Sequence, residues 1–148
     1  MKAVDGRVLV DTNVLIYATL EDDPRHARAH ELLLSSGRGE RFVSVQNLAE
    51  MYPNLTGPKM EHPDSPSVAR TKIRSIAELE TIQVLPVTGD VQAIALELCE
   101  KHGIVRQRYY DAQLVATMIA HGIETLLTEN AADFSDMKEI RAVNPFAA

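Results

Sequence analysis

Residues 7–13 read RVLVDTN, a short apolar run that ends abruptly on an acidic residue. The run after Arg7 predicts a strand that is buried on both faces, as strands of parallel sheets are. Asp11 then stands at the carboxyl end of this strand. Ligands of open parallel sheets bind at the carboxyl ends of the strands. The stretch therefore predicts both a sheet and a candidate functional position on its edge.

Strand and helix patterns alternate outward from this stretch. We expect further strands at 41–45, 83–87, 125–127 and 140–143, and helices at 14–20, 24–35, 67–80 and 90–102. Asn47 is expected to cap a short helix that carries Glu50, and Asp111 is expected to open another helix. The proline-rich residues 53–66 are expected to form a long surface loop. The alternation indicates an α/β protein with a mainly parallel sheet, folded as one domain over residues 1–148.

The composition is that of an ordinary globular protein, with 148 residues, 45% hydrophobic and 24% charged. The single cysteine, Cys99, excludes an intramolecular disulfide and is expected in the core. Because we find no leader pattern and no apolar run near the ~20 residues that span a bilayer, we expect a cytoplasmic protein without a membrane segment. The net charge of −6 argues against a protein that binds nucleic acid with its whole surface, because such binding usually requires a basic surface.

Acidic residues mark several predicted elements. Asp11 ends the first strand, Glu50 lies on the short helix, and residues 128–133 follow the strand at 125–127. Asp111 begins a helix face that continues as an apolar stripe of Leu114, Val115 and Met118. Carboxylates that converge repel one another, so their convergence would predict a bound cation. Hard oxygen ligands favour Mg²⁺, or Mn²⁺, over zinc.

A site of this kind predicts phosphodiester hydrolysis by a water molecule that the metal activates and orients. This chemistry requires no nucleophilic side chain. The sequence offers no persuasive nucleophile, since Ser44 lies on a predicted strand without an evident partner base.

Four short motifs follow one another along the chain: VDTN at 10–13, NLAE at 47–50, DA at 111–112 with LVAT at 114–117, and LTENAADF at 127–134. With these motifs in this order, the chain resembles PIN-domain proteins over nearly its whole length. Within that family it is similar to the VapC-type toxins of bacterial toxin–antitoxin pairs. The resemblance implies a three-layer α/β/α fold with a mainly parallel central sheet of four to five strands. It also implies a Mg²⁺-dependent ribonuclease that acts as the toxin of such a pair.

The resemblance also implies the site residues. These are the catalytic, metal-binding carboxylates Asp11, Glu50 and Asp111, and the site-organising residues Asn13 and Thr128. Many family members carry an aspartate where this chain has Asn130, so either Asp133 as a fourth catalytic acid or a water held by Asn130 must complete the site. Because an amide contributes no charge, we expect one firmly bound ion, and a second when RNA phosphate joins the site.

The partners that the resemblance implies are an RNA substrate, a cognate antitoxin protein whose tail enters the acidic groove, and a second copy in a homodimer. Residues 106–110 interleave cations with tyrosines, so Arg106 and Arg108 are candidates for holding RNA phosphate beside the cut site. A solvated basic loop is the alternative interpretation of this segment.

Alternatives remain at this stage for single residues and for the whole chain. Asp11, Asp111 and Asp133 could cap helices or a turn, and Glu50 could be a solvated helix residue. A PIN-fold module could bind RNA or a protein partner without cutting. A haloacid-dehalogenase-like phosphatase would share the acid after the first strand, but it needs a second aspartate where this chain has Asn13.

Overall fold

The computed structural model describes residues 6–34 and 40–147. Its centre is a sheet of five parallel strands in the order β3-β2-β1-β4-β5. The strands are β1 (Val8–Val10), β2 (Arg41–Ser44), β3 (Ile82–Leu85), β4 (Thr125–Leu127) and β5 (Arg141–Val143). The predicted α/β class with a parallel sheet is confirmed, and β5 is the edge strand that the sequence predicts.

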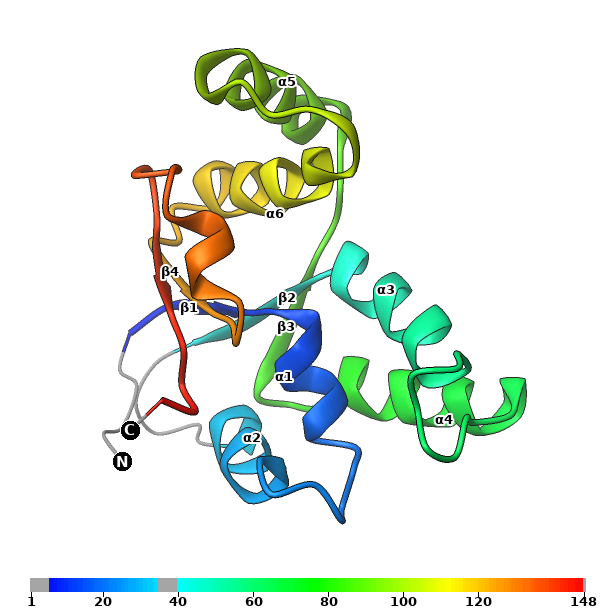
Figure 1. The fold of residues 1–148 in the computed structure, drawn as a ribbon. Helices are drawn as coiled ribbons and strands as arrows, with labels where there is room; N and C mark the ends of the chain where they lie inside the picture. Colours follow the sequence, from blue (N-terminus) through cyan, green and yellow to red (C-terminus); the bar gives the residue numbers. More distant parts are fainter. Residues whose placement is uncertain (1–5, 35–39, 148) are drawn as a thin grey trace.

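Helices cover both faces of the sheet and make three layers (Figure 1). One face packs against α5 (Gly89–His102) and α6 (Tyr109–Ala120), and the other against α1 (Thr12–Tyr17), α2 (His26–Leu34), α3 (Val45–Leu55) and α4 (Pro66–Ala77). Within β1, Leu9 points into the core on the α5–α6 side, while Val8 and Val10 point into the opposite core. All three side chains are fully buried. An apolar run without alternation is therefore what a strand covered on both faces requires.

Two predicted helix starts are wrong, because other residues cap these helices. α1 begins at Thr12, since the Asp11 side chain already accepts a hydrogen bond from its backbone N–H. α3 begins directly after Ser44, whose hydroxyl caps it. Asn47 lies in the first turn of α3 instead, where its Oδ1 accepts from the Ser44 N–H at 2.9 Å and completes a capping box.

The predicted surface loop at 53–66 is present but shorter, and it spans residues 56–65. α3 continues through Pro53 to Leu55, and α4 begins at Pro66, so a shorter segment connects the two helices. A proline inside a helix costs about 3 kcal/mol. Met51 and Leu55, one turn apart, are 0% and 1% exposed. Burying two side chains of this size stabilises the fold by roughly 3–6 kcal/mol, so packing outweighs the helix-breaking effect of proline.

Other predictions agree with the structure. β4 spans the predicted residues, and α5 ends before Gly103, whose φ of 65° is the left-handed conformation that glycine favours at helix ends. α6 begins at Tyr109, so Asp111 lies in its first turn and does not open the helix. The predicted apolar stripe of α6 is buried; it comprises Leu114, Val115 and Met118.

Parts of two predictions lie outside the described residues. These are the last residue of the helix predicted at 24–35 and the outermost residues of the predicted domain 1–148. In the described ranges, no helix has both the length and the apolar character that crossing a membrane requires.

Candidate functional site

Asp11 lies at the carboxyl end of the central strand. Its backbone N–H donates to the Leu127 carbonyl at 2.9 Å and so continues the pairing of β1 with β4. Its Oδ1 accepts from the Thr12 N–H at 2.8 Å. The capping interpretation is therefore correct for Asp11, but the cap occupies one carboxylate oxygen and leaves the other for further contacts.

The other oxygen of Asp11 is held from the end of β4. The Thr128 hydroxyl donates to Asp11 Oδ2 at 2.7 Å and accepts from Asn13 Nδ2 at 3.3 Å and from the Asn130 N–H at 3.1 Å. Its one donor and two acceptor sites are thus all used. Asn47 Nδ2 lies a further 3.4 Å from Asp11 Oδ1. Every described group that makes a hydrogen bond to the Asp11 carboxylate is a donor, so these contacts require a side chain that only accepts.

Asn13 joins the ends of the two neighbouring strands. Its Nδ2 lies 3.5 Å from Asp11 Oδ2, and its Oδ1 accepts from the Glu129 N–H at 3.1 Å. Arg25 holds the same segment from outside, because its Nη1 lies 3.0 Å from the Glu129 carboxylate while its guanidinium stacks 3.8 Å above the Tyr17 ring. These contacts immobilise the segment that carries Thr128. The organising roles of Asn13 and Thr128 stay predictions, and their positions suit those roles.

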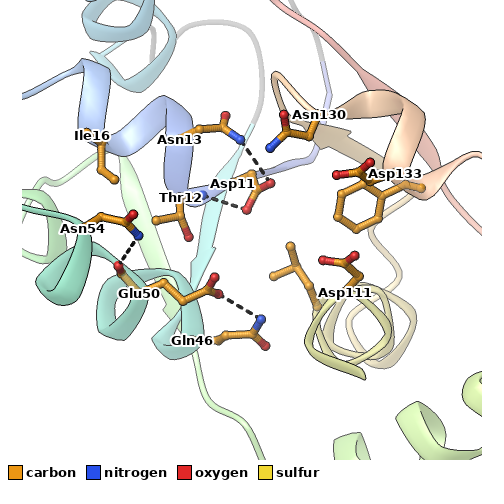
Figure 2. Close-up of a pocket in the computed structure, with 12 residues that line it drawn as sticks. Asp11, Thr12, Asn13, Ile16, Gln46, Glu50, Asn54, Asp111, Asn130 and Asp133 are labelled. Carbon is orange, nitrogen blue, oxygen red and sulfur yellow. Dashed lines mark hydrogen bonds between the residues drawn. The ribbon is translucent and has the colours of Figure 1, made fainter. Parts of the chain in front are cut away.

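A cavity of about 240 Å³ opens at this edge of the sheet, and Figure 2 shows acidic side chains around it. Asp11 faces it from the end of β1, Glu50 from α3, Asp111 from α6, and Asp133 from the 3-10 helix η2 (Ala131–Phe134). Asn13 and Asn130 also line its wall, whereas Thr128 is fully buried behind Asp11. The structure therefore brings four acids from four separate elements to one cavity, as the sequence predicts.

The capping interpretation fails for the other two aspartates. The N-cap of α6 is Arg108 and the N-cap of η2 is Asn130, so Asp111 and Asp133 cap neither helix. Within the part of the chain that the structure describes, no group donates a hydrogen bond to the Asp133 side chain, so it does not cap the turn at 133–136 either. Among the described residues, no group donates a hydrogen bond to the Asp111 carboxylate. Glu50 is exposed, as a solvated helix residue would be, yet its side chain faces the cavity (Figure 2).

Gln46 links the two helices that carry Glu50 and Asp111. Its Nε2 donates to Glu50 Oε1 at 3.0 Å and to the Tyr110 carbonyl at 2.9 Å, while its Oε1 accepts from Gln113 Nε2 at 2.8 Å. This contact fixes α3 against α6 across the cavity. Neither glutamine is predicted from the sequence as part of the site. The four-residue spacing of Gln46 and Glu50 was the available signal for the first, and no pattern marked Gln113.

Burial and mutual repulsion raise the pKa of three of these carboxyl groups. Burial is the main cause for Asp11; the charge of Asp133 adds to it, and hydrogen bonds to the carboxylate act against it. Burial and then the charge of Asp11 raise the pKa of Asp111 to about 6, although Arg108 lowers it. The pKa of Glu50 is raised first because its carboxylate, at the cavity wall, is partly removed from water although the residue as a whole is exposed. Asp11 and Asp111 raise it further, and the hydrogen bond from Gln46 acts against the shift. The ionised cluster therefore carries an electrostatic cost that a bound cation would remove.

The ligand chemistry of the cavity fits a hard divalent cation. Carboxylate and amide oxygens face the same space, and Mg²⁺ and Mn²⁺ prefer such ligands. Within residues 6–34 and 40–147, no group of three or more His, Cys, Asp or Glu side chains is arranged so that it could hold a metal ion by itself. The four acids line one cavity without forming such a group. This arrangement suits Mg²⁺, which keeps several water ligands and binds proteins through one or two carboxylates.

The two arginines predicted to bind RNA lie in different settings. Arg108 Nη2 donates to the Asp133 carbonyl at 2.9 Å, and its Nε lies 3.9 Å from Asp111 Oδ2. Arg106 starts the 3-10 helix η1 (Arg106–Arg108) with a left-handed φ of 57°. Its side chain makes no hydrogen bond or ion pair with the described residues. Neither arginine lines the acidic cavity, although Arg108 lies at its rim, and RNA binding by both stays a prediction.

Comparison with known proteins agrees with this fold. A sequence model of the PIN domain matches residues 8–140, and the chain belongs to the PIN domain family. The chain is also 30% identical over 145 residues to ribonuclease VapC24 of Mycobacterium tuberculosis, with 94% of this chain and 97% of that protein covered. The resemblance that the four motifs carry is therefore confirmed.

Solved structures share the fold. Mycobacterium tuberculosis VapC20, described as a sarcin-ricin loop cleaving toxin, matches with a TM-score of 0.68 and 23% identity, covering 90% of this chain and 98% of its own. A toxin–antitoxin complex from Klebsiella pneumoniae matches with a TM-score of 0.64 and 20% identity, covering 95% of this chain and 99% of its own. These structures confirm the three-layer arrangement.

Proposed function

We propose that this chain is a divalent-metal-dependent ribonuclease that hydrolyses RNA phosphodiester bonds as the toxin of a toxin–antitoxin pair. The convergence of four acids on one cavity of a PIN fold carries this proposal. The identity to a ribonuclease along 94% of the chain supports the reaction type. We propose Mg²⁺ as the physiological ion, with Mn²⁺ able to replace it, and residues 1–148 as one functional domain.

Asp11, Glu50 and Asp111 are the proposed metal-binding residues. Donors hold both oxygens of Asp11 in place, so little side-chain entropy is lost when it binds an ion. Gln46 holds Glu50 in the same way from one side. Bound Mg²⁺ would activate a water for attack on the phosphorus and neutralise charge on the leaving oxygen. The protein side chains supply the geometry, and no side-chain nucleophile is needed.

The fourth side of the site combines the two residues that the sequence left as alternatives. Asn130 and Asp133 both line the cavity. The charge of Asp133 acts on Asp11 and Asp111, so it belongs to the same electrostatic cluster. We propose that Asp133 supplies the fourth negative charge and that Asn130 supplies a neutral oxygen or holds a water.

Arg108 is the proposed contact for RNA phosphate at the rim, since it is exposed and lies 3.9 Å from Asp111. Arg106 is a second candidate, because it is exposed and holds no partner among the described residues. A few cations beside an acidic cavity can hold phosphate although the chain carries a net charge of −6.

The proposed protein partners are an antitoxin and a second copy of the chain. A similar structure is described as a toxin–antitoxin complex, which supports the first. An Arg side chain from an antitoxin would suit the cavity, because it could neutralise carboxylates whose pKa is raised by repulsion and burial.

The phosphatase alternative loses support from the geometry of Asn13. A general acid must carry a proton that it can give up. Asn13 is an amide whose oxygen and nitrogen are both engaged, with Glu129 and Thr128. The binding-only module is a separate alternative, and the cation experiment below distinguishes it.

Removal of divalent cations is expected to lower RNA cleavage at least about 100-fold, because the acidic cavity then repels the phosphate. The measurement is cleavage of a fluorescent single-stranded RNA by dialysed protein in EDTA, followed by titration with Mg²⁺ or Mn²⁺. Asp11→Ala and Asp111→Ala serve as matched variants and should stay inactive at every cation concentration. Equal, low activity in all three proteins would instead support a module that binds without cutting.

Replacement of Thr128 by Val is expected to lower cation affinity or activity about 10- to 100-fold, because the isosteric side chain keeps the packing but no longer holds Asp11. A Mn²⁺ titration and a cleavage assay measure the two effects. Thr125→Val, at the start of the strand that Thr128 follows and away from the cavity, is the control and should change neither. Wild-type affinity and activity in Thr128→Val would contradict the organising role.

A further inference from the structure

A second and larger groove of about 1000 Å³ adjoins the acidic cavity between α3 and α6. We name it the side groove. Its own lining residues are Val45, Ala49, Pro53, Val87, Gln107, Tyr110 and Gln113, and it shares further residues with the cavity. The shared residues are Gln46, Glu50, Asn54 and Asp111. Because the two hollows have a common wall, any polymer whose phosphate enters the cavity has neighbouring units within reach of the side groove.

The side groove differs from the cavity in its chemistry. Apart from the shared Glu50 and Asp111, none of the described residues that line it is charged. Its own surface is apolar and aromatic, with Val45 44%, Val87 38% and Tyr110 53% exposed. Gln107 and Gln113 add amide groups that can both donate and accept hydrogen bonds. Because its own lining carries no cation, this surface does not attract a phosphate by charge, whereas a flat base with polar edges matches it.

Tyr110 is held in place by its neighbours. Its carbonyl accepts from Gln46 Nε2 at 2.9 Å. Its ring meets the Tyr109 ring edge-on, with centroids 5.4 Å apart and an interplanar angle of 80°. The Tyr109 hydroxyl in turn donates to Gln113 Oε1 at 3.1 Å. An aromatic ring that stays exposed yet is fixed by its surroundings provides a stacking surface at low entropic cost.

We propose that the side groove is a nucleobase subsite: it takes an unpaired base of the RNA next to the cut bond, stacked on Tyr110, with an edge within reach of the Gln107 and Gln113 amides. This inference rests on the proposed ribonuclease function and names its substrate class as single-stranded RNA at the cut site. A base paired in a duplex has neighbours on both faces and cannot offer a free face to Tyr110.

The test uses the absence of tryptophan from the chain. Tyr110→Trp places one fluorophore in the side groove. Tyr52→Trp places one on α3 outside the side groove, at a tyrosine that is 41% exposed, and serves as the control. Each variant is mixed with Mg²⁺ and a 12-nucleotide oligouridylate in a stopped-flow instrument, so that binding is observed before cleavage. The second probe is a ribose-phosphate oligomer of the same length without bases.

We expect oligouridylate to quench the fluorescence of the Tyr110→Trp variant in a saturable way. The abasic oligomer should quench this variant little, and neither oligomer should quench Tyr52→Trp strongly. Tyr110→Ala should raise KM about 5- to 100-fold with less than a twofold change in kcat, and Tyr110→Phe should restore wild-type KM. Unchanged Mn²⁺ affinity in Tyr110→Ala would separate this effect from loss of the metal site.

Three outcomes would overturn the inference. Equal quenching by both oligomers would mean that the contact is made to the backbone. An unchanged KM in Tyr110→Ala, with wild-type protein active, would leave the nuclease intact and remove the subsite. A shift in Tyr110→Trp emission with protein concentration alone would mean that a second copy covers the groove. Base-dependent quenching without any RNA cleavage would support the subsite and reject the nuclease, so the two proposals fail separately.

Discussion

Asp11→Asn is expected to lower kcat/KM for RNA cleavage at least about a thousandfold. The variant loses the central negative charge of the proposed metal site. It also cannot repeat the hydrogen bonds of the aspartate. Whichever way the new amide turns, its Nδ2 faces either the Thr12 N–H or the Thr128 hydroxyl, and both groups already donate to this position. Thr128 cannot accept instead, because Asn13 and Asn130 occupy its acceptor sites.

The measurement is steady-state cleavage of a single-stranded RNA, together with a Mn²⁺ titration. Asp90→Asn is the control, because Asp90 is an exposed aspartate in the first turn of α5 and does not line the cavity. It should retain wild-type activity. Asp11→Asn activity within tenfold of wild type would contradict a central metal-binding role for Asp11.

Asp111→Asn is expected to have two opposite effects: loss of cleavage by about 100-fold or more, and a higher Tm of the ion-free protein at pH 7. Asp111 accepts no hydrogen bond from the described residues, so the amide leaves no donor unpaired. Burial is the main cost of its charge, and repulsion by Asp11 and Asp133 adds to this cost, although Arg108 reduces it. The Asp111 side chain is 35% exposed, so solvent screens its charge. We therefore expect the substitution to raise the free energy of unfolding of the ion-free protein by about 1 kcal/mol, which corresponds to about 2–4 °C in Tm.

The sign of the pH dependence follows from the pKa of Asp111, which is raised from 3.8 to about 6. Above pH 6 the ionised group destabilises the folded protein relative to the unfolded chain. Between pH 6 and 3.8 the folded state binds the proton more tightly, so this cost disappears as the pH falls. The stability advantage of Asp111→Asn in EDTA should therefore be full at pH 7 and absent near pH 4.

Thermal unfolding at both pH values, with and without Mn²⁺, checks this prediction. Saturating Mn²⁺ should reverse the order at pH 7, because the ion stabilises wild type and removes the repulsion. Asp11→Asn provides the matched comparison, and it should have a lower Tm than Asp111→Asn in EDTA because its amide breaks hydrogen bonds. A Tm for Asp111→Asn at or below that of ion-free wild type would show that the charge of Asp111 does not destabilise the ion-free protein.

The sequence by itself determined the elements whose signals are local. An apolar run without alternation predicts a strand covered on both faces, and Leu9 and Val10 do point into opposite cores. The rule for carboxyl ends of parallel strands then placed Asp11 at the functional edge. The spacing of Leu114, Val115 and Met118 identified the buried face of α6. These inferences need only the periodicity of a strand or a helix.

Local signals failed where packing or a distant partner decides the outcome. Pro53 and the following residues resemble a loop in sequence, but burial of Met51 and Leu55 keeps α3 helical. Asn47 has the chemistry of a cap, yet Ser44 takes that place because β2 ends on Ser44 and α3 begins at the next residue. In both cases the free energy of a tertiary contact exceeds the local preference.

The site itself shows the same division. The sequence identified the acids, because a carboxylate is recognisable wherever it stands. Only the tertiary structure decided their environment: the Thr128 hydroxyl that holds Asp11, the contact from Gln46 to Gln113 that joins α3 to α6, and the pKa of Asp111. Hydrogen bonds, burial and charge repulsion depend on distances between groups, and for pairs 67 positions apart (Gln46 and Gln113) or 117 apart (Asp11 and Thr128) those distances exist only after the chain has folded.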